Sequence, residues 1–456
     1  MQREGSHASI ATTTASRRKS VSESAHAPAP AAMPAFNPVA VALKKLTMAG
    51  VLFIVVFFCV ALWLFGSLYE TADHTYKLSV AIVDFDGGPV GSALLSAVNA
   101  VNGQRTFPTF HVLAANSTSP NDVLRSVFEG QYWGSIVATE GASSRFEAAI
   151  ASADAATSYD ASQALQYSGL EVRYATAWSG VVLPALNKVM QSAELIFERE
   201  IVAPLLTSGT AYSSPSAQVL ADPIGATFIN QAPFTQGTRI VLNTIGFVLP
   251  FLFQFFFLMA MNGLFLGLGV YRGMSLGRHL KFRLVISLLW TLLTSLCSVA
   301  WGLMFDEDYS IEAKNFFASW TVHWVFSIIV FDTFDIVTTW VAPQFVSYIV
   351  VSVIILSVSS VIWPLELSNE FYAIHYAFPA PATWSILITI LGRGCVNTLS
   401  RDAPVLMAWL IVLKAGVFMS LRRRAKQGVV LAQVEEKPVA TGEGPEREVE
   451  VERLGV

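Results

Sequence analysis

The sequence predicts a polytopic α-helical membrane protein with six spans and an α/β domain that lies outside the membrane, between the first and second spans. Three observations carry this prediction. The chain of 456 residues is 53% hydrophobic and only 14% charged, whereas soluble proteins have about 25% charged residues. Apolar runs longer than about 18 residues recur, and that length crosses a hydrocarbon core of about 30 Å. Between two of these runs, one long segment alternates strand-like and helix-like patterns instead.

The two ends of the chain have compositions typical of disorder. Residues 1–43 are rich in Ser, Thr, Ala and Pro, and residues 426–456 are mostly polar and acidic. Neither segment has enough apolar surface to build a core, so we expect disordered tails. The first tail contains "RRKS", in which Ser20 is a phosphorylation candidate, although so short a pattern also arises by chance.

The first span is expected at 44–69, and the other five lie within 237–425. We place these five at 240–268, 284–304, 316–340, 345–363 and 403–421. The segment 364–402 is amphipathic and rich in proline, and its apolar stretch "TWSILITIL" is too short to span. We expect this segment to dip into the outer interface or to lie along it.

The positive charges predict the orientation of the chain. Lys44 and Lys45 precede the first span, the loop "YRGMSLGRHLKFR" carries four basic residues and no acid, and "RRRAK" follows the last span. Cytoplasmic loops are enriched in Lys and Arg, so both termini are expected in the cytoplasm. Residues 70–236 and the acidic connection "DEDYSIEAK" are then expected outside.

Residues 70–236 read as a small α/β layer. Strands are expected at 78–84, 107–113, 132–139 and 170–175, and helices at 90–101, 119–130, 143–152 and 178–203. Ser119 is placed as an N-cap with Pro120 in the first helical position. Asn116 opens the only N-x-S/T sequon of the chain and is a glycosylation candidate on the outer side.

The stretch "VDFDGG" after the first strand invites three readings. It could be a phosphate loop, a metal site at Asp84 and Asp86, or an Asp-Gly turn that leads into a helix. It matches no phosphate-binding motif and lacks the ligand ladder of a calcium loop, so we favour the turn. The three cysteines form no disulfide or metal-ligand pattern. Because no nucleophile elbow or triad pattern is present either, we expect no enzyme activity, no cofactor and no metal.

Charged residues inside the predicted spans are the main candidate site. His323, Asp332 and Asp335 lie in the fourth span, and the two aspartates share a helix face. A charge near the bilayer centre costs at least about 2.5–3.5 kcal/mol, so these side chains should face protein or water. One reading is a substrate or proton pathway, and the other is a structural cluster paired across helices. Lys414 of the sixth span is the candidate partner, which an exchange of charges between Asp335 and Lys414 would test.

Gly263 and Gly267 form a G-x-x-x-G pair on the second span, which permits close packing of helices. The pair serves either ordinary packing within the chain or a seam between two copies, so a homodimer stays possible. Membrane lipids are expected partners, and nucleic acid is not.

Two stretches in this order resemble a known family. One is "VAIVDFDGG" after the first span, and the other precedes the last span and contains the residues Pro364, Glu366, Phe371, Tyr372, Tyr376 and Pro379. The arrangement resembles the fungal nitrosoguanidine-resistance membrane proteins and, through them, the type-2 ABC permease superfamily and the phage-infection-protein-like membrane proteins of bacteria. The likeness covers residues 45–425.

The resemblance implies a multi-pass plasma-membrane protein that confers drug or mutagen resistance by exporting amphipathic drugs or handling lipids. The chain has no ATPase motif of its own. The alternative is therefore a regulator or scaffold that transports nothing and alters the lipid properties of the membrane. A third reading is an ion-coupled carrier that uses Asp332 and Asp335.

Overall fold

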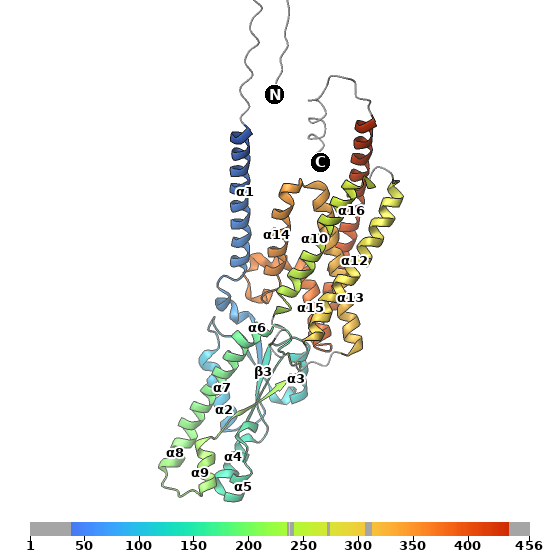
Figure 1. The fold of residues 1–456 in the computed structure, drawn as a ribbon. Helices are drawn as coiled ribbons and strands as arrows, with labels where there is room; N and C mark the ends of the chain where they lie inside the picture. Colours follow the sequence, from blue (N-terminus) through green and yellow to red (C-terminus); the bar gives the residue numbers. More distant parts are fainter. Residues whose placement is uncertain (1–37, 235–236, 238–240, 271–273, 306–311, 437–456) are drawn as a thin grey trace, which may run out of the picture. The chain divides into compact units, whose positions relative to one another are not determined.

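The computed structural model describes residues 38–234, 237, 241–270, 274–305 and 312–436 (Figure 1). Contacts between residues divide the chain into two units, between Leu52 and Phe53. Helix α1, Pro38–Ser67, begins in the first unit and ends in the second. It therefore starts inside the segment predicted as a disordered tail; Ser20 lies outside the described residues.

A five-stranded mixed sheet follows α1, after the 3₁₀ helix η1 at Thr71–Lys77. The strand order is β2-β1-β3-β4-β5, and only β3 and β4 run antiparallel. The strands are β1 Ser79–Asp84, β2 Thr109–Leu113, β3 Gly134–Ala138, β4 Leu165–Gly169 and β5 Ala226–Asn230. The first three confirm the predicted strands, and β5 was not predicted.

Helices cover both faces of this sheet. Val80 and Ile82 of β1 join the core with α2, Pro89–Val101, and α7, Leu183–Phe197. Ala81 and Val83 of the same strand lie on the opposite face of the sheet, where they pack with α3, Pro120–Phe128. This alternation is the period of two expected of a strand buried on both sides. Shorter helices complete the layer: η2 Ala115–Ser117, α4 Ala142–Ala151, α5 Ala153–Thr157, η3 Ala161–Gln163 and α9 Ser214–Ala221.

The start of α3 was predicted correctly from its local sequence. Ser119 accepts a hydrogen bond from the backbone N–H of Asp122, and Asp122 accepts one from the N–H of Ser119, which completes a capping box. The long helical segment predicted at 178–203 is also present. It runs through α6 Ala175–Ala177, a π-helical segment Trp178–Val182, α7, a second π-helical segment Glu198–Val202, and α8 Ala203–Thr207.

The fourth predicted strand, 170–175, is wrong. These residues form a turn, and the strand β4 comes directly before them. Leu170, Val172 and Tyr174 are buried in the core, so their alternation reflects packing and not strand pairing. Gly169 is the last residue of β4, and the ring of Trp178 occupies the space that a side chain there would need.

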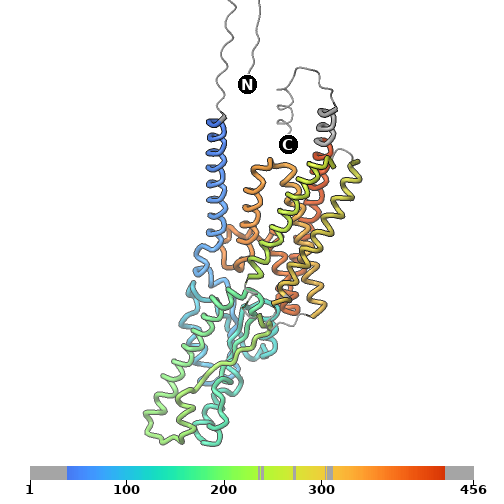
Figure 2. Tube along the Cα trace, in the orientation of Figure 1, coloured from blue at the N-terminus to red at the C-terminus, as the bar shows by residue number. Residues whose placement is uncertain are grey.

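Beyond the sheet, apolar helices gather into a bundle (Figures 1 and 2). Its members are α10 Ile245–Gly267, α12 Leu276–Met304, α13 Ala313–Trp340, α14 Pro343–Ser359, α15 Pro379–Leu391 and α16 Leu399–Glu436. Helix α13 is central, since it packs against α10, α12, α14, α15 and α16. The helix α16 continues to Glu436, well into the segment predicted as a disordered tail.

Within the described residues, five helices are long and apolar enough to cross a membrane: α1, α10, α12, α13 and α16. The chain is thus a multi-pass membrane protein with an α/β domain between its first two candidate spans. The fifth predicted span corresponds to α14, which has 17 residues and is shorter than these five.

The segment between α14 and α16 contains two short 3₁₀ helices, η7 Leu365–Leu367 and η8 Glu370–Ala377, followed by α15. The helices η8 and α15 meet at an angle of 76°. Most of α15 is buried against α13 and α16, so this part of the segment is inside the bundle and does not lie along its surface.

Candidate functional site

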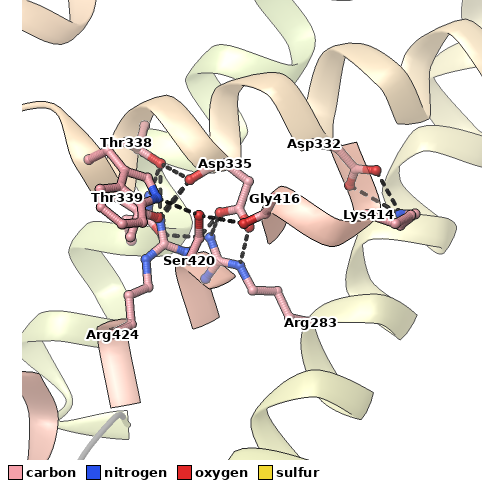
Figure 3. Close-up of polar contacts among 11 residues, drawn as sticks. Arg283, Asp332, Asp335, Thr338, Thr339, Lys414, Gly416, Ser420 and Arg424 are labelled. Atoms are coloured by element: carbon pink, nitrogen blue, oxygen red, sulfur yellow. Dashed lines mark hydrogen bonds and ion pairs between the residues drawn. The ribbon is translucent and has the colours of Figure 1, made fainter. Parts of the chain in front are cut away.

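Asp335 of α13 lies between two arginines from neighbouring helices (Figure 3). Its carboxylate accepts hydrogen bonds from Arg283 of α12, with Nε at 3.1 Å, and from Arg424 of α16, with Nη1 at 2.7 Å. The three side chains are 1%, 4% and 9% exposed, respectively. The cluster therefore carries one net positive charge in a buried place and joins three helices.

Two polar residues complete this cluster. Asn262 of α10 accepts a hydrogen bond from Arg283 at 3.0 Å and donates one to Thr338 of α13 at 3.2 Å. The hydroxyl of Thr338 also accepts from Arg424 at 3.1 Å. Guanidinium donors that are not used by the carboxylate thus find acceptors, as buried polar groups require. The cluster holds α10, α12, α13 and α16 together.

Asp332 forms a separate pair with Lys414 of α16, at 2.8 Å (Figure 3). Lys414 therefore pairs across helices with Asp332, and not with Asp335 as the proposed exchange of charges assumed. Asp335 is taken by the two arginines, one turn further along α13. The side chain of Lys414 is 39% exposed, so this pair is only partly enclosed.

His323 belongs to neither pair. It precedes Asp332 by nine residues, or about 13 Å along a helix. Its Nδ1 lies 2.9 Å from the carbonyl oxygen of Ser319, and the ring lines an apolar cavity of about 60 Å³ among α10, α12, α13 and α15. The four residues predicted as one intramembrane site are thus three separate features.

Arg283 and Arg424 were not predicted as partners of Asp335. Both were considered only as charges that fix the orientation of the chain. Arg283 belongs to the predicted basic loop after the second span, and Arg424 belongs to the flank after the last span. The sequence did contain a signal, because the basic residues stand at those ends of two spans that are expected to lie at the same depth as an acid near the end of the fourth. Arg272 of that loop lies outside the described residues.

A polar cavity of about 240 Å³ lies where the α/β domain meets the membrane helices. One wall belongs to α15 and is apolar apart from Ser385. The other residues come from the end of α3, the turn after β4, the segment around η7 and η8, and the start of α16. The cavity contains charged groups of both signs: Glu129, Arg173, Glu366, Arg401 and Asp402.

Arg173 contacts three neighbouring groups at this cavity. Its guanidinium lies 3.8 Å from the centroid of the Trp133 ring, and contacts Glu366 and the carbonyl oxygen of Gly130, each at 3.4 Å. Burial lowers the pKa of Arg173, and the negative charge of Glu366 opposes that shift. Arginine remains charged under such conditions, since its ordinary pKa is above 12.

Arg401 and Asp402 form the second pair at the cavity. Nε and Nη2 of Arg401 donate to the two carboxylate oxygens of Asp402 at 2.8 and 3.2 Å. Arg401 is 52% exposed, whereas Asp402 is buried. The guanidinium also lies 5.4 Å from the centroid of the Tyr376 ring. Glu366 and Tyr376 both belong to the stretch before the last span that the sequence analysis singled out.

The rest of that stretch holds the end of α1. Trp63 donates a hydrogen bond from Nε1 to Nε2 of His375 at 2.9 Å, and its ring packs edge-on against Tyr372. Ser368 donates to the carbonyl oxygen of Ser67 at 2.9 Å. The segment before α15 therefore contacts the first helix on one side and the α/β domain on the other.

The "VDFDGG" stretch forms the predicted turn. Asp84 accepts from the backbone N–H groups of Asp86 and Gly87, and Gly87 has a φ of +63°. Asp86 accepts from Ser143 at the start of α4, which fixes the turn to that helix. Within the part of the chain that the structure describes, no three His, Cys, Asp or Glu residues lie close enough together to bind a metal.

The remaining candidates lie apart from these features. Asn116 is exposed in η2, accessible to modification. Cys395 is buried in the loop between α15 and α16, and burial raises the pKa of its thiol to about 12, which leaves it unreactive at neutral pH. Near Gly263 and Gly267, no described atom lies within 4 Å of the place where a side chain would begin.

Comparison with known proteins gives one match. A family described as "Protein of unknown function (DUF3533)" matches residues 49–415, which is most of the chain. No curated protein and no solved structure matches the chain significantly.

Proposed function

Since the chain belongs to the DUF3533 family, whose function is unknown, we propose a function from the geometry of its site: the protein handles lipids at the outer face of the membrane. Drug or mutagen resistance follows from that activity, as the likeness to the nitrosoguanidine-resistance proteins and type-2 ABC permeases implies. The observation that carries the proposal is the polar cavity beside α15. It combines charged groups with an apolar helix wall, which is the chemistry of an amphipathic ligand.

The cavity has the position that lipid handling at the outer face requires. We place the α/β domain outside and both termini in the cytoplasm, in a plasma membrane that the chain crosses six times. Helix α14 provides the sixth crossing, since 17 residues of helix reach about 26 Å and the chain continues apolar to Trp363.

In this topology, the bent pair of helices η8 and α15 is a re-entrant segment. Glu366, before η8, pairs with Arg173 of the α/β domain. Val396, after α15, donates its backbone N–H to the carbonyl oxygen of Phe128 at 2.9 Å in the same domain. A segment whose two ends contact one domain enters and leaves the bundle on one side.

Lipid handling fits the two cavities better than the export of whole drug molecules. Drug-sized ligands occupy pockets of about 300–1,000 Å³. The polar cavity of about 240 Å³ and the apolar cavity of about 60 Å³ are both smaller. A lipid needs to place only its headgroup in the polar cavity, while its chains stay among the helices and the bilayer.

The test is transport by purified protein in liposomes. Vesicles receive a lipid with a fluorescent chain or a fluorescent drug, with ATP, with a proton gradient, or with neither. We expect movement of the lipid between leaflets to exceed that of protein-free vesicles and to exceed drug flux. No movement of lipid from well-folded protein under any of the three conditions would refute the proposal.

A second candidate is a scaffold that transports nothing and alters membrane properties. It is favoured by the cluster at Asp335, whose opposite charges are paired and tie four helices together as a structural element would. The same liposomes distinguish the two candidates, because a scaffold gives resistance in cells without flux in vesicles. The pair Gly263 and Gly267 offers a packing surface for a second copy in either case.

A further inference from the structure

The polar cavity has an excess of acid. Three carboxylates, Glu129, Glu366 and Asp402, face two guanidiniums, Arg173 and Arg401. A site for a simple anion would carry more positive than negative charge. The composition instead fits a ligand that presents a negative and a positive group at once.

The guanidinium donors of the cavity are not all used. Arg401 directs Nε and Nη2 at Asp402 and is half exposed, so Nη1 is available to an anionic oxygen. Arg173 makes both of its polar contacts at 3.4 Å, close to the limit of a hydrogen bond. An anionic oxygen of a ligand could therefore bind either arginine without breaking a short hydrogen bond.

The carboxylates are also accessible. Glu366 is 37% exposed although it pairs with Arg173. Glu129 is exposed, and its contact within the described residues is a hydrogen bond from Gln131 at 3.2 Å. Tyr174 and Tyr376 add aromatic rings to the same lining. Carboxylates beside aromatic rings are the surroundings that a primary or quaternary ammonium group prefers.

The size of the cavity limits the ligand to a small polar group. Its volume of about 240 Å³ leaves room for several water molecules, and so for a group of that size. On the wall that α15 provides, Pro381, Ala382 and Ile388 offer apolar surface beside Ser385, and α15 is itself a helix of the bundle. A ligand with a charged head and an apolar remainder matches both parts of the lining.

We propose that this cavity binds the zwitterionic headgroup of a phospholipid, phosphocholine or phosphoethanolamine. The phosphate contacts Arg401 and Arg173, and the ammonium group lies among Glu129, Glu366 and the tyrosine rings. This assignment rests on the proposed function, which it narrows from lipids in general to one headgroup class.

Binding of four lipids with identical chains tests the assignment. Full-length protein in mild detergent is titrated with chain-labelled phosphatidylcholine, phosphatidylethanolamine, phosphatidylglycerol and diacylglycerol, and soluble glycerophosphocholine is the fifth arm. We expect the two zwitterionic lipids to bind at least tenfold more tightly than the other three ligands.

Two variants give the sharper result. Arg401→Gln should weaken binding of all three phospholipids, whereas Glu129→Gln should weaken the zwitterionic lipids and strengthen phosphatidylglycerol. Glu129 forms no ion pair within the described residues, so its substitution does not threaten folding. The matched controls are Arg125→Gln in the exposed pair with Asp122, and Glu147→Gln on the exposed face of α4; both should bind like the parent protein.

Several outcomes would overturn the assignment. Equal binding of diacylglycerol and phosphatidylcholine would show that the headgroup is not recognised, and equal binding of glycerophosphocholine would show that the ligand comes from solution. Tighter binding of phosphatidylglycerol than of the zwitterionic lipids would refute the assignment to a zwitterionic headgroup, but not lipid handling itself. The same holds if Glu129→Gln leaves the preference between these lipids unchanged. Failure of every lipid to bind, together with no flux in vesicles, would refute the proposed function as well.

Discussion

Replacing Asp335 by asparagine should destabilise the membrane helices more than neutralising either of its arginine partners. The substitution keeps the shape of the side chain and removes its charge. Arg283 and Arg424 then both lose the carboxylate that they share, whereas Arg424→Gln leaves the ion pair between Asp335 and Arg283 in place.

The size of the effect follows from the geometry. With an effective dielectric constant of about 20, unit charges separated by about 3–4 Å attract each other by about 4–5.5 kcal/mol. Breaking a buried pair by removing one partner costs about 3–5 kcal/mol, because the remaining charge is still desolvated. We therefore expect Asp335→Asn to lower the ratio of folded to unfolded protein by about two to three and a half orders of magnitude. Arg424→Gln should cost less, and the double variant should recover part of the loss.

Thermal stability of the detergent-solubilised protein is the assay. The fraction that stays monodisperse on size exclusion after heating gives an apparent melting temperature for each variant, and the yield from membranes gives a second measure. The expected order of stability is parent, Arg424→Gln, the double variant and Asp335→Asn. A stability of Asp335→Asn equal to that of Arg424→Gln would refute the reasoning, because it would mean that the carboxylate does not compensate both arginines.

The remaining predictions concern other parts of the chain. Exchanging Asp332 and Lys414 should restore the yield and melting temperature lost in either single reversal, and lack of rescue would contradict their pairing. Gly169→Ala should lower the free energy of unfolding by about 1–3 kcal/mol or more, since the added methyl group would overlap the Trp178 ring. Gly180→Ala should be tolerated, because no described atom lies within 4 Å of the added group. Equal melting temperatures of the two variants would disprove this prediction. Burial raises the pKa of Tyr159 to about 12, so the stability that its neutral hydroxyl contributes is complete below the unfolded pKa of about 10 and is lost as pH rises through 12. Tyr159→Phe should therefore flatten the fall in melting temperature between about pH 10 and 12. A pH profile that is unchanged in this variant would count against the prediction. Asn116→Gln should remove an endoglycosidase-sensitive shift in gel mobility, and a parent chain without that shift would contradict an outer placement.

Local patterns were sufficient wherever the structure depends on neighbours in sequence. The N-cap of α3 needs only Ser119, Pro120 and Asp122, and all three lie within four residues. The turn after β1 likewise needs Asp84 and the glycines that follow it. Five long apolar helices were also predictable, because their length and composition are properties of continuous segments.

Features that depend on tertiary contacts were not predictable in this way. The segment 170–175 alternates like a strand, but the backbone that pairs with β3 belongs to the less apolar residues before it. The choice between them depends on Trp178, which packs over Gly169 and stacks on Phe228 of β5. Neither contact can be read from the alternation of apolar residues.

The partners of the intramembrane acids show the same limit. The sequence indicates that Asp332 and Asp335 share a face of one helix, and this is correct. It does not indicate that α12 and α16 both contact that face, so one lysine appeared to be the available partner. The arrangement of the helices brings Arg283 and Arg424 to Asp335 and leaves Lys414 to Asp332.

The exposure of the charged side chains also distinguishes a structural cluster from a binding site in this molecule. At Asp335, three charged side chains are each less than a tenth exposed and are held by short contacts, which is the arrangement of a fixed joint between helices. At the polar cavity, Glu366 and Arg401 pair with their partners while 37% and 52% of their side chains stay exposed. Charges that stay accessible can exchange an internal partner for a ligand at little cost, whereas enclosed charges cannot. We therefore assign recognition to the cavity beside α15 and assign cohesion of the helices to the cluster at Asp335.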